Sequence, residues 1–391
     1  MSLPDSVKRS ISDDRARSLA RRVCIVAPVH AWDDVRVFHK QAVTLAAAGY
    51  EIVLLAQAKK RLTAHGVQVK AVWAPRTPRA LRFLSLPLVL VQALVQRADV
   101  YHLHNPDTLP LCVALKVFGR RVIYDTHEDF SRRIGIREWI PRALRPLVSS
   151  GVVRAERFVA KIADRTIATQ AVVAARLGER AVVIGNPPRT DAALLQRVRE
   201  RSAAAGRSPD DGLRAIYVGL VSETRGLFDM IDSAELVNAE HRMHLRIIGP
   251  ALPGQIEKAR ARSGWRHVDY LDTMPQDDAF ACIAESDVGL AVLHDIADIS
   301  HADPNKLYEY MVFGKAFIAS NFPEWKARLQ GIDGGWFVSP GSVEEMAAAL
   351  KAAMDPEVRN RKGKAGAAFV RLYNWEKESA RLIDIYREIL S

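Results

Sequence analysis

Residues 300–325 read SHADPNKLYEYMVFGKAFIASNFPEW and predict a helix that leads directly into a buried strand. Asp303 and Pro304 are a typical N-cap and first helical residue, and Gly314 suits the position just after a helix. The run Ala316–Ala319 is short and apolar, as expected of a strand inside a sheet. A helix followed at once by a buried strand is the repeating unit of parallel α/β sheets.

The same alternation runs through the rest of the chain. A helix is expected from Val35 to Ala48 and an amphipathic helix from Trp375 to Ser391, while residues 186–213 are polar and predict an interdomain linker. Apolar strands are expected at 22–28, 51–56, 99–104, 121–125, 166–168 and 182–185, and then at 214–218, 245–249, 268–271, 288–293, 316–319 and 335–338. The pattern predicts an α/β protein with two Rossmann-like domains that face a cleft.

Charge is distributed unevenly between the two predicted domains. Residues 1–190 hold 31 Lys and Arg against 15 Asp and Glu, whereas the remainder holds 25 against 30. The whole chain of 391 residues carries a formal charge of +11. A basic first half fits nucleic acid or an anionic lipid surface, and charge alone does not choose between them.

Several features favour a cytoplasmic protein. The three cysteines are far apart and match neither a disulfide framework nor a metal cluster. The first twenty residues are polar and lack the apolar core of a secretory signal. The most apolar run, Leu84–Val95, is too short to span a bilayer, so we expect at most a peripheral position on the inner face of the cell membrane.

The turn after the first strand argues against a bound redox cofactor. Residues 28–34 read PVHAWDD, without the G-x-G-x-x-G that lets a dinucleotide pyrophosphate approach the backbone. No phosphate-binding P-loop pattern occurs either. We therefore expect no cofactor.

The helix after Asp303 carries the strongest candidate for ligand chemistry. Its N-terminus would attract an anion, and Asn305, Lys306 and Glu309 fall on one side of it. Such a helix can hold a diphosphate beside the lysine, with Glu309 accepting hydrogen bonds from two ribose hydroxyls. The alternative is a capped surface helix with a solvated Lys–Glu pair.

Several stretches in order resemble retaining glycosyltransferases of family 4, also called glycosyl transferases group 1. They read DDVRVFHKQAVTLAAAGYEIVLLA, DVYHLHNPDTLPL, VIYDTHEDF, AIYVGLVSETRGLFDMI, LRIIGP, PNKLYEYMVFGKAFIAS and NWEKESARLIDIYREIL. The resemblance covers residues 21–391 and implies the GT-B fold. It implies an acceptor-binding domain 1–190, with 375–391 packing back on it, and a nucleotide-sugar-binding domain 191–374. It also implies retention of configuration without a metal, and the chain indeed has no Asp-x-Asp.

The resemblance also implies roles for individual residues. Glu309 is similar to the ribose-binding carboxylate and, with His127, is expected in the catalytic centre, where His127 positions and polarises. The expected donor-binding residues are Gly219, Arg225, His301, Asn305, Lys306, Leu307 and Glu309. Two positions depart from the family: Leu220 replaces a frequent arginine, and His301 replaces the glutamate that usually touches the donor sugar.

Polar residues at the ends of the early strands are candidates for the acceptor site. They are Asp33, Arg36, His104, Asn105 and Glu128. For Asp33 and Arg36 the alternative is a surface ion pair, and for His127 it is a capping or core-edge histidine. A metal on His102, His104 and an aspartate is a further alternative, but no additional ligand is evident, so we expect no metal.

The segment 131–165 is the most basic part of the chain. Nine Lys and Arg alternate with Trp139 and aliphatic residues at near-helical spacing, which is typical of an interfacial helix on anionic lipid. The alternative is a solvated Arg-rich face. Nucleic acid is a poorer match, because no aromatic stacking platform accompanies the charge.

Together these features predict a glycosyltransferase of the hexosyltransferase type. It would transfer a sugar from a UDP- or GDP-linked donor to a hydroxyl of a lipid-linked or cell-surface glycan precursor. Two alternatives stay open: a non-catalytic subunit that binds sugar nucleotides, which the departures at Leu220 and His301 motivate, and a sugar-nucleotide epimerase of the same fold.

Overall fold

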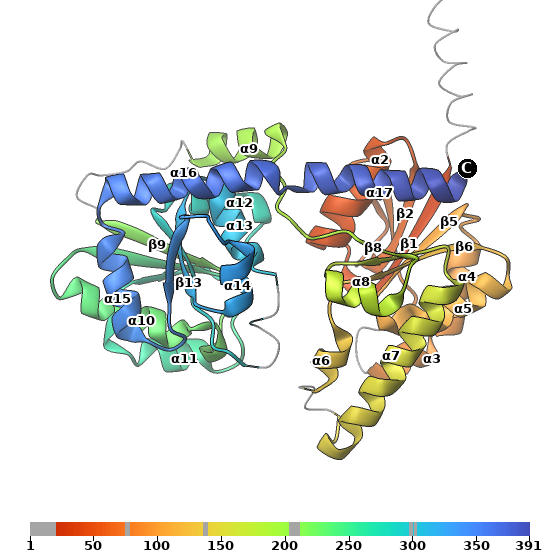
Figure 1. The fold of residues 1–391 in the computed structure, drawn as a ribbon, viewed down its shortest axis with the longest axis horizontal. Helices are drawn as coiled ribbons and strands as arrows, with labels where there is room; N and C mark the ends of the chain where they lie inside the picture. Colours follow the sequence, from red (N-terminus) through yellow and green to blue (C-terminus); the bar gives the residue numbers. More distant parts are fainter. Residues whose placement is uncertain (1–20, 75–78, 136–139, 203–211, 297–299, 301–302) are drawn as a thin grey trace, which may run out of the picture. The chain divides into compact units, whose positions relative to one another are not determined.

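The computed structural model describes residues 21–74, 79–135, 140–202, 212–296, 300 and 303–391. The chain forms two compact units (Figure 1). Unit 1 comprises residues 1–185 together with 377–391, and unit 2 comprises residues 186–376. The C-terminal helix α17 (Trp375–Leu390) therefore returns the chain to unit 1.

Unit 1 is built on an eight-stranded sheet in which neighbouring strands are parallel, apart from the antiparallel pair β3 and β4. Its strand order is β3-β4-β2-β1-β5-β6-β7-β8. The strands are β1 (Arg22–Ala31), β2 (Glu51–Gln57), β3 (Leu62–Ala64), β4 (Val67–Ala71), β5 (Val100–His104), β6 (Arg121–Thr126), β7 (Arg165–Ala168) and β8 (Ala181–Val183).

Helices α4, α5 and α7 cover one face of this sheet and share a hydrophobic core with β5 and β6. Tyr101, Leu103, Val122 and Tyr124 belong to that core. The helical segments of unit 1 are η1 (Val35–Ala42), α2 (Val43–Ala47), α3 (Arg79–Leu84), α4 (Leu86–Leu94), η2 (Pro106–Thr108), α5 (Leu109–Val117), α6 (Phe130–Gly135), η3 (Arg142–Leu144), α7 (Arg145–Ile162) and α8 (Ala171–Leu177), followed at the C-terminus by α17.

Unit 2 is built on a six-stranded parallel sheet in the order β11-β10-β9-β12-β13-β14. Its strands are β9 (Leu213–Val218), β10 (Met243–Ile248), β11 (Val268–Tyr270), β12 (Val288–Ala291), β13 (Ala316–Ser320) and β14 (Gly335–Val338). Its helical segments are α9 (Ala192–Ser202), η5 (Glu223–Arg225), α10 (Leu227–Asn238), α11 (Gln255–Arg260), η6 (Ser263–His267), α12 (Gln276–Glu285), α13 (Asn305–Val312), α14 (Pro323–Arg328), α15 (Val343–Ala352) and α16 (Pro356–Leu372).

Both sheets have a point at which the strand order reverses. It lies between β1 and β5 in unit 1 and between β9 and β12 in unit 2. In parallel α/β sheets, ligands bind outside the carboxyl ends of the strands at such a point. The predicted pair of Rossmann-like domains is thus confirmed, and each domain has its own candidate binding edge.

Local details differ from the sequence expectation. The helix predicted from Val35 begins as the π-helical segment η1 and becomes α-helical only at Val43. The helix expected to begin at Pro304 begins at Asn305, with Pro304 as its N-cap, and the Asp303 carboxylate pairs with Arg328 at 2.5 Å. No helix in the described ranges is both long and apolar enough to cross a bilayer.

Candidate active site

The alternation of side chains along two neighbouring strands brings several polar residues together in unit 1. Tyr101 and Leu103 of β5 point into the hydrophobic core, so His102 and His104 lie on the opposite face of the sheet. On β6, Tyr124 belongs to the same core, so Asp125 shares the face of the two histidines. His104 and Asp125 are direct neighbours across the strand pair.

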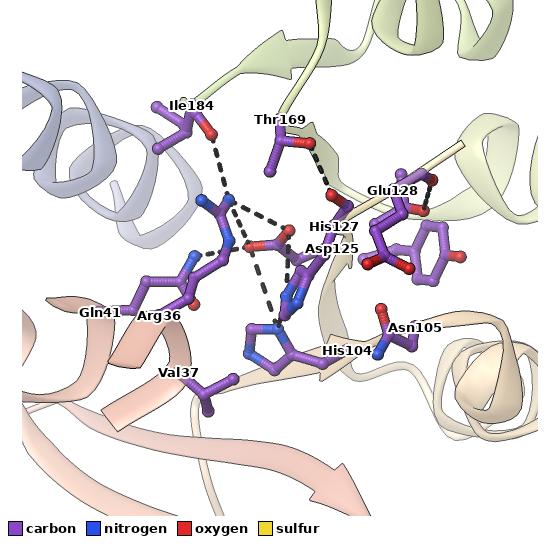
Figure 2. Close-up of polar contacts among 12 residues, drawn as sticks. Arg36, Val37, Gln41, His104, Asn105, Asp125, His127, Glu128, Thr169 and Ile184 are labelled. Atoms are coloured by element: carbon purple, nitrogen blue, oxygen red, sulfur yellow. Dashed lines mark hydrogen bonds and ion pairs between the residues drawn. The ribbon is translucent and has the colours of Figure 1, made fainter. Parts of the chain in front are cut away.

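Asp125 is the centre of this group and is fully buried (Figure 2). Both of its carboxylate oxygens lie 3.3 Å from Nη2 of Arg36, and Oδ2 accepts a hydrogen bond of 2.6 Å from Gln41. Arg36 is itself held by the carbonyl oxygens of Ile184 and Gly185, at 3.1 and 2.8 Å. A buried carboxylate needs such partners, because an isolated charge would be strongly destabilised.

His127 follows β6 and meets the same group. Its Nε2 lies 2.8 Å from Nδ1 of His104 and 3.6 Å from Oδ1 of Asp125. Its backbone carbonyl accepts a hydrogen bond of 2.7 Å from Thr169, which fixes the chain after β6 (Figure 2). The ring of His30, at the end of β1, lies 5.2 Å from the His127 ring between centroids.

The electrostatics of the group keep His104 and His127 neutral. Burial lowers the pKa of His127 to about 3, although Asp125 opposes this shift. Burial and the neighbouring His102 likewise hold the pKa of His104 well below its ordinary value. Burial would raise the pKa of Asp125, but Arg36 and the histidine rings hold it well below the ordinary range, so the carboxylate is ionised.

His102, His104 and Asp125 offer ligand atoms within 4.8 Å of one another, a spacing that can hold a metal ion. The Asp125 carboxylate is, however, already paired with Arg36 and hydrogen-bonded to Gln41. A divalent cation would add two buried positive charges beside a guanidinium. The donor set therefore fits a hydrogen-bonded network better than a metal centre.

The structure revises several predicted acceptor contacts. Arg36 and His104 are buried within the network, so the surface ion pair considered for Arg36 is wrong. Glu128 forms an ion pair with Arg133, and Asp33 is exposed. Asn105 is buried and adopts a φ of 69°, a backbone conformation that residues other than glycine rarely adopt.

In unit 2, Gly219 follows β9 and lies directly against Lys306 of α13. A Cβ atom on Gly219 would lie 2.5 Å from Cε and 2.7 Å from Nζ of Lys306. The Lys306 ammonium also lies 5.0 Å from the centroid of the Tyr217 ring. The hydroxyl of Tyr217 donates to the carbonyl of Leu220, which is 39% exposed.

The electrostatic surroundings of Lys306 bring two further predicted residues into the same group. Burial and then Arg225 lower the pKa of Lys306 to about 8, whereas Glu309 raises it. Arg225 ends η5, and the following Gly226 has a φ of 75° and is pressed against the carbonyl of Val292. Two cations and one carboxylate thus gather beside the carboxyl end of β9, a combination suited to a phosphate and a hydroxylated sugar.

The remaining predicted donor-binding residues are Leu307, Asn305 and His301. The side chain of Leu307 is fully buried in the hydrophobic core of unit 2. Asn305 is exposed, and its backbone N–H donates to the carbonyl of Asp303. The N–H of Leu307 donates to the carbonyl of Pro304. His301 lies outside the described residues.

Sequence reasoning missed several members of the unit 1 network. Asp125 ends the expected strand 121–125 and has no role in the sequence prediction, although its place in YDTHE next to His127 is a signal. The shared face of His102 and His104, by contrast, follows from their spacing along a strand. Gln41, His30 and Tyr386 carried no signal, because their contacts join segments far apart in the chain.

Comparison with known proteins agrees with this architecture. Residues 35–189 match the family model of the glycosyl transferase 4-like domain, and residues 212–355 match that of glycosyl transferases group 1. A phosphatidyl-myo-inositol mannosyltransferase of Mycobacterium leprae is 25% identical over 299 residues, which is 74% of each chain. The protein of the same name from Mycobacterium tuberculosis is 25% identical over 309 residues, again with 74% of each chain covered.

Solved structures share the fold at low identity. The sucrose-phosphate synthase of Thermosynechococcus elongatus superimposes with a TM-score of 0.72 and 16% identity, covering 95% of this chain and 99% of its own. HepE of Anabaena, solved in complex with UDP, gives a TM-score of 0.65 and 13% identity, with coverages of 94% and 100%.

The fold, the two polar strand-end clusters and the family matches together define a glycosyltransferase with the GT-B fold. The chain belongs to the enzymes that join a glycosyl transferase 4-like domain to a glycosyl transferases group 1 domain, and its activity is of the hexosyltransferase type.

Proposed function

We propose that this enzyme transfers a hexosyl group from a UDP- or GDP-linked sugar to a hydroxyl of a lipid-linked glycan precursor, with retention of configuration and without a metal. The observation that carries the donor assignment is the convergence of Gly219, Arg225, Lys306 and Glu309 at the end of β9. The relatives support the substrate classes: the curated mannosyltransferases act on a phosphatidylinositol, and HepE binds UDP.

In the proposed reaction the diphosphate lies against Lys306 and Arg225. Negative charge develops on the leaving phosphate as the glycosidic bond breaks, and the two cations stabilise it. The departing phosphate oxygen accepts the proton of the attacking hydroxyl, so no strong protein base is needed. Glu309 accepts hydrogen bonds from the ribose hydroxyls of the nucleotide.

His127 fits a positioning role in this reaction better than a role as a general base. Its pKa of about 3 keeps the ring neutral at physiological pH, but its Nε2 is already engaged with His104. A neutral ring held in one orientation can polarise a sugar hydroxyl through its other nitrogen. Asn105 and Asp33 remain the candidates for contacts with the acceptor.

The basic segment 131–165 supports a peripheral position on anionic lipid. Leu147, Arg154, Phe158 and Lys161 recur along α7 at helical spacing and are all exposed. Glu156, the acidic residue of this helix, is fully buried and paired with Arg176. The outer face of α7 therefore offers basic and apolar side chains together, as interfacial helices do. Trp139, which contributed to the prediction, lies outside the described residues.

Calorimetric titration of UDP, GDP, ADP and TDP tests the donor site. One nucleotide should bind at micromolar levels, and Glu309→Ala should weaken it about ten- to hundredfold, since hydrogen bonds to a charged group contribute about 1.5–3 kcal/mol. The exposed Glu257→Ala in the same unit serves as the control and should bind like the wild type. Equal affinity in Glu309→Ala would refute the proposed site.

Turnover experiments test the remaining parts of the proposal. With the matching nucleotide sugar, proton NMR of the product reports whether the anomeric configuration is retained, and chelation by EDTA should leave the rate unchanged.

Co-sedimentation with lipid vesicles tests the α7 face. Arg154→Glu with Lys161→Glu should abolish co-sedimentation with vesicles containing phosphatidylglycerol, whereas turnover of a soluble acceptor persists. Binding that is unaffected by these two substitutions would exclude the α7 face as the lipid contact.

A further inference from the structure

The C-terminal helix contributes one buried polar group to the unit 1 network. The hydroxyl of Tyr386 on α17 lies 2.8 Å from Nδ1 of His102, and both side chains are fully buried. Tyr386 belongs to the segment 377–391, which rejoins unit 1 after the chain has formed all of unit 2. The network at the end of β5 and β6 is therefore completed by a residue 284 positions away in the sequence.

The direction of the hydrogen bond between Tyr386 and His102 follows from the second nitrogen of the ring. Nε2 of His102 lies 3.5 Å from Oδ2 of Asp125. This contact is longer than a hydrogen bond, but an unprotonated nitrogen would turn its lone pair toward an ionised carboxylate, so the tautomer with the proton on Nε2 is the more stable one. Nδ1 is then the unprotonated nitrogen, and the hydroxyl of Tyr386 donates to it. Tyr386 thereby selects the tautomer in which His102 directs its N–H toward Asp125.

Asp125 links His102 to His127. Its Oδ2 faces His102, and its Oδ1 lies 3.6 Å from Nε2 of His127. A second connection runs through His104, whose ring stacks on His102 with centroids 4.5 Å apart and whose Nδ1 lies 2.8 Å from Nε2 of His127. A change in the tautomer or tilt of His102 therefore reaches His127 by two routes.

We propose that Tyr386 is a positioning residue for His127: by donating to His102 it fixes the orientation of Asp125 and His104, and through them the orientation of the His127 ring. The inference rests on the proposed role of His127 in glycosyl transfer. It makes the C-terminal helix part of the active-site architecture. Without residues 377–391, unit 1 would keep the strand ends that are proposed to meet the acceptor, but the His127 ring would not be held in its functional orientation.

Nitrogen NMR of histidine side chains tests this inference without relying on turnover. We expect the wild type to show His102 protonated at Nε2, with signals assigned through His102→Gln and His127→Gln. Tyr386→Phe keeps the ring but removes the donor, so it should shift the Nδ1 signal of His102 and also the ring signals of His127. The matched control is Tyr50→Phe, because the Tyr50 ring packs 5.6 Å from that of Tyr386, and it should shift neither.

Kinetics provide the second readout. Tyr386→Phe should lower kcat about two- to tenfold, the value of one neutral hydrogen bond, while the KM for the nucleotide sugar stays within twofold. Loss of thermal stability with unchanged His127 signals and unchanged kcat would overturn the inference and leave Tyr386 a packing residue. If the wild type turns over no donor, the proposed function fails, but the NMR arm still decides whether Tyr386 controls His127.

Discussion

Gly219 and the end of the Lys306 side chain are packed so closely that a Cβ atom on Gly219 would force the lysine to move. A Cβ atom on Gly219 would lie 2.5 Å from Cε of Lys306, and the backbone of Gly219 has a φ of 144°. The glycine thus places the ammonium group beside the end of β9, near Arg225. This contact joins the first strand of unit 2 to the helix α13, at the edge of the sheet where we propose that the phosphate binds.

Gly219→Ala should displace Lys306 and weaken the binding of the preferred nucleotide at least tenfold, as measured by calorimetry. Gly254→Ala is the matched control, because Gly254 also has a positive φ, of 76°, but its added Cβ would meet nothing within 4 Å. The backbone cost is about 1–2 kcal/mol for Gly254→Ala and about 1–3 kcal/mol for Gly219→Ala, whose φ of 144° lies outside the left-handed helical region. Only Gly219→Ala should lose affinity; a similar loss in both would point to backbone strain instead.

Arg36→Gln should destabilise unit 1 by about 3–5 kcal/mol, because it leaves the buried Asp125 carboxylate without its cation. Combining it with Asp125→Asn should recover part of the loss, since the uncompensated charge disappears. Urea denaturation followed by tryptophan fluorescence and circular dichroism measures both. Arg387→Gln removes one partner of an exposed ion pair with Asp384 and should change stability by less than about 0.5 kcal/mol.

Mild acid should destabilise the enzyme through His104 and His127, whose pKa values burial lowers in the folded state, to about 3 for His127. The unfolded chain takes up a proton on each near pH 6.5, whereas the folded chain does not. Above about pH 6.5 both histidines are neutral in the folded and in the unfolded chain, so the folded state carries no penalty. As the pH falls from 6.5 toward 3, only the unfolded chain gains these protons, and the free energy of unfolding decreases. Each histidine should lower the free energy of unfolding by about 1–2 kcal/mol between pH 6.5 and 5.

Denaturation of wild type and His104→Gln at pH 7, 6 and 5 measures this dependence. The variant should lose less stability than the wild type over the interval, by the amount expected of one histidine. His241→Gln, at an exposed position, should keep the wild-type pH dependence. Identical pH dependence in wild type and His104→Gln would show that this histidine is not kept neutral by folding.

Asn105 stores backbone strain at the end of β5. Its φ of 69° favours glycine, so Asn105→Gly should leave thermal stability unchanged or raise it, while Asn105→Ala, which keeps the strain, should be about 1–2 kcal/mol less stable than Asn105→Gly. Both variants lose the contact of the amide with His30, at 3.3 Å. If the two variants have equal melting temperatures, strain at this position is negligible.

Several features of this protein follow from the sequence alone. Alternating apolar strands and helices predict parallel sheets, because each such segment must bury one face against its neighbours. Gly49 and Gly314 mark helix ends, and both adopt a positive φ in the structure. The group of Lys306 and Glu309 on α13 was also predictable, since residues three apart on a helix lie side by side.

Only the tertiary structure decided the partners of the buried charges. Arg36 was expected near an acceptor, but packing of η1 against the sheet turns it onto Asp125. Tyr386 reaches His102 only because the chain returns to unit 1 after forming unit 2. Secondary structure is encoded in local periodicity, whereas the hydrogen bonds of a buried polar group depend on which distant segments exclude water from it, and no local pattern records that choice.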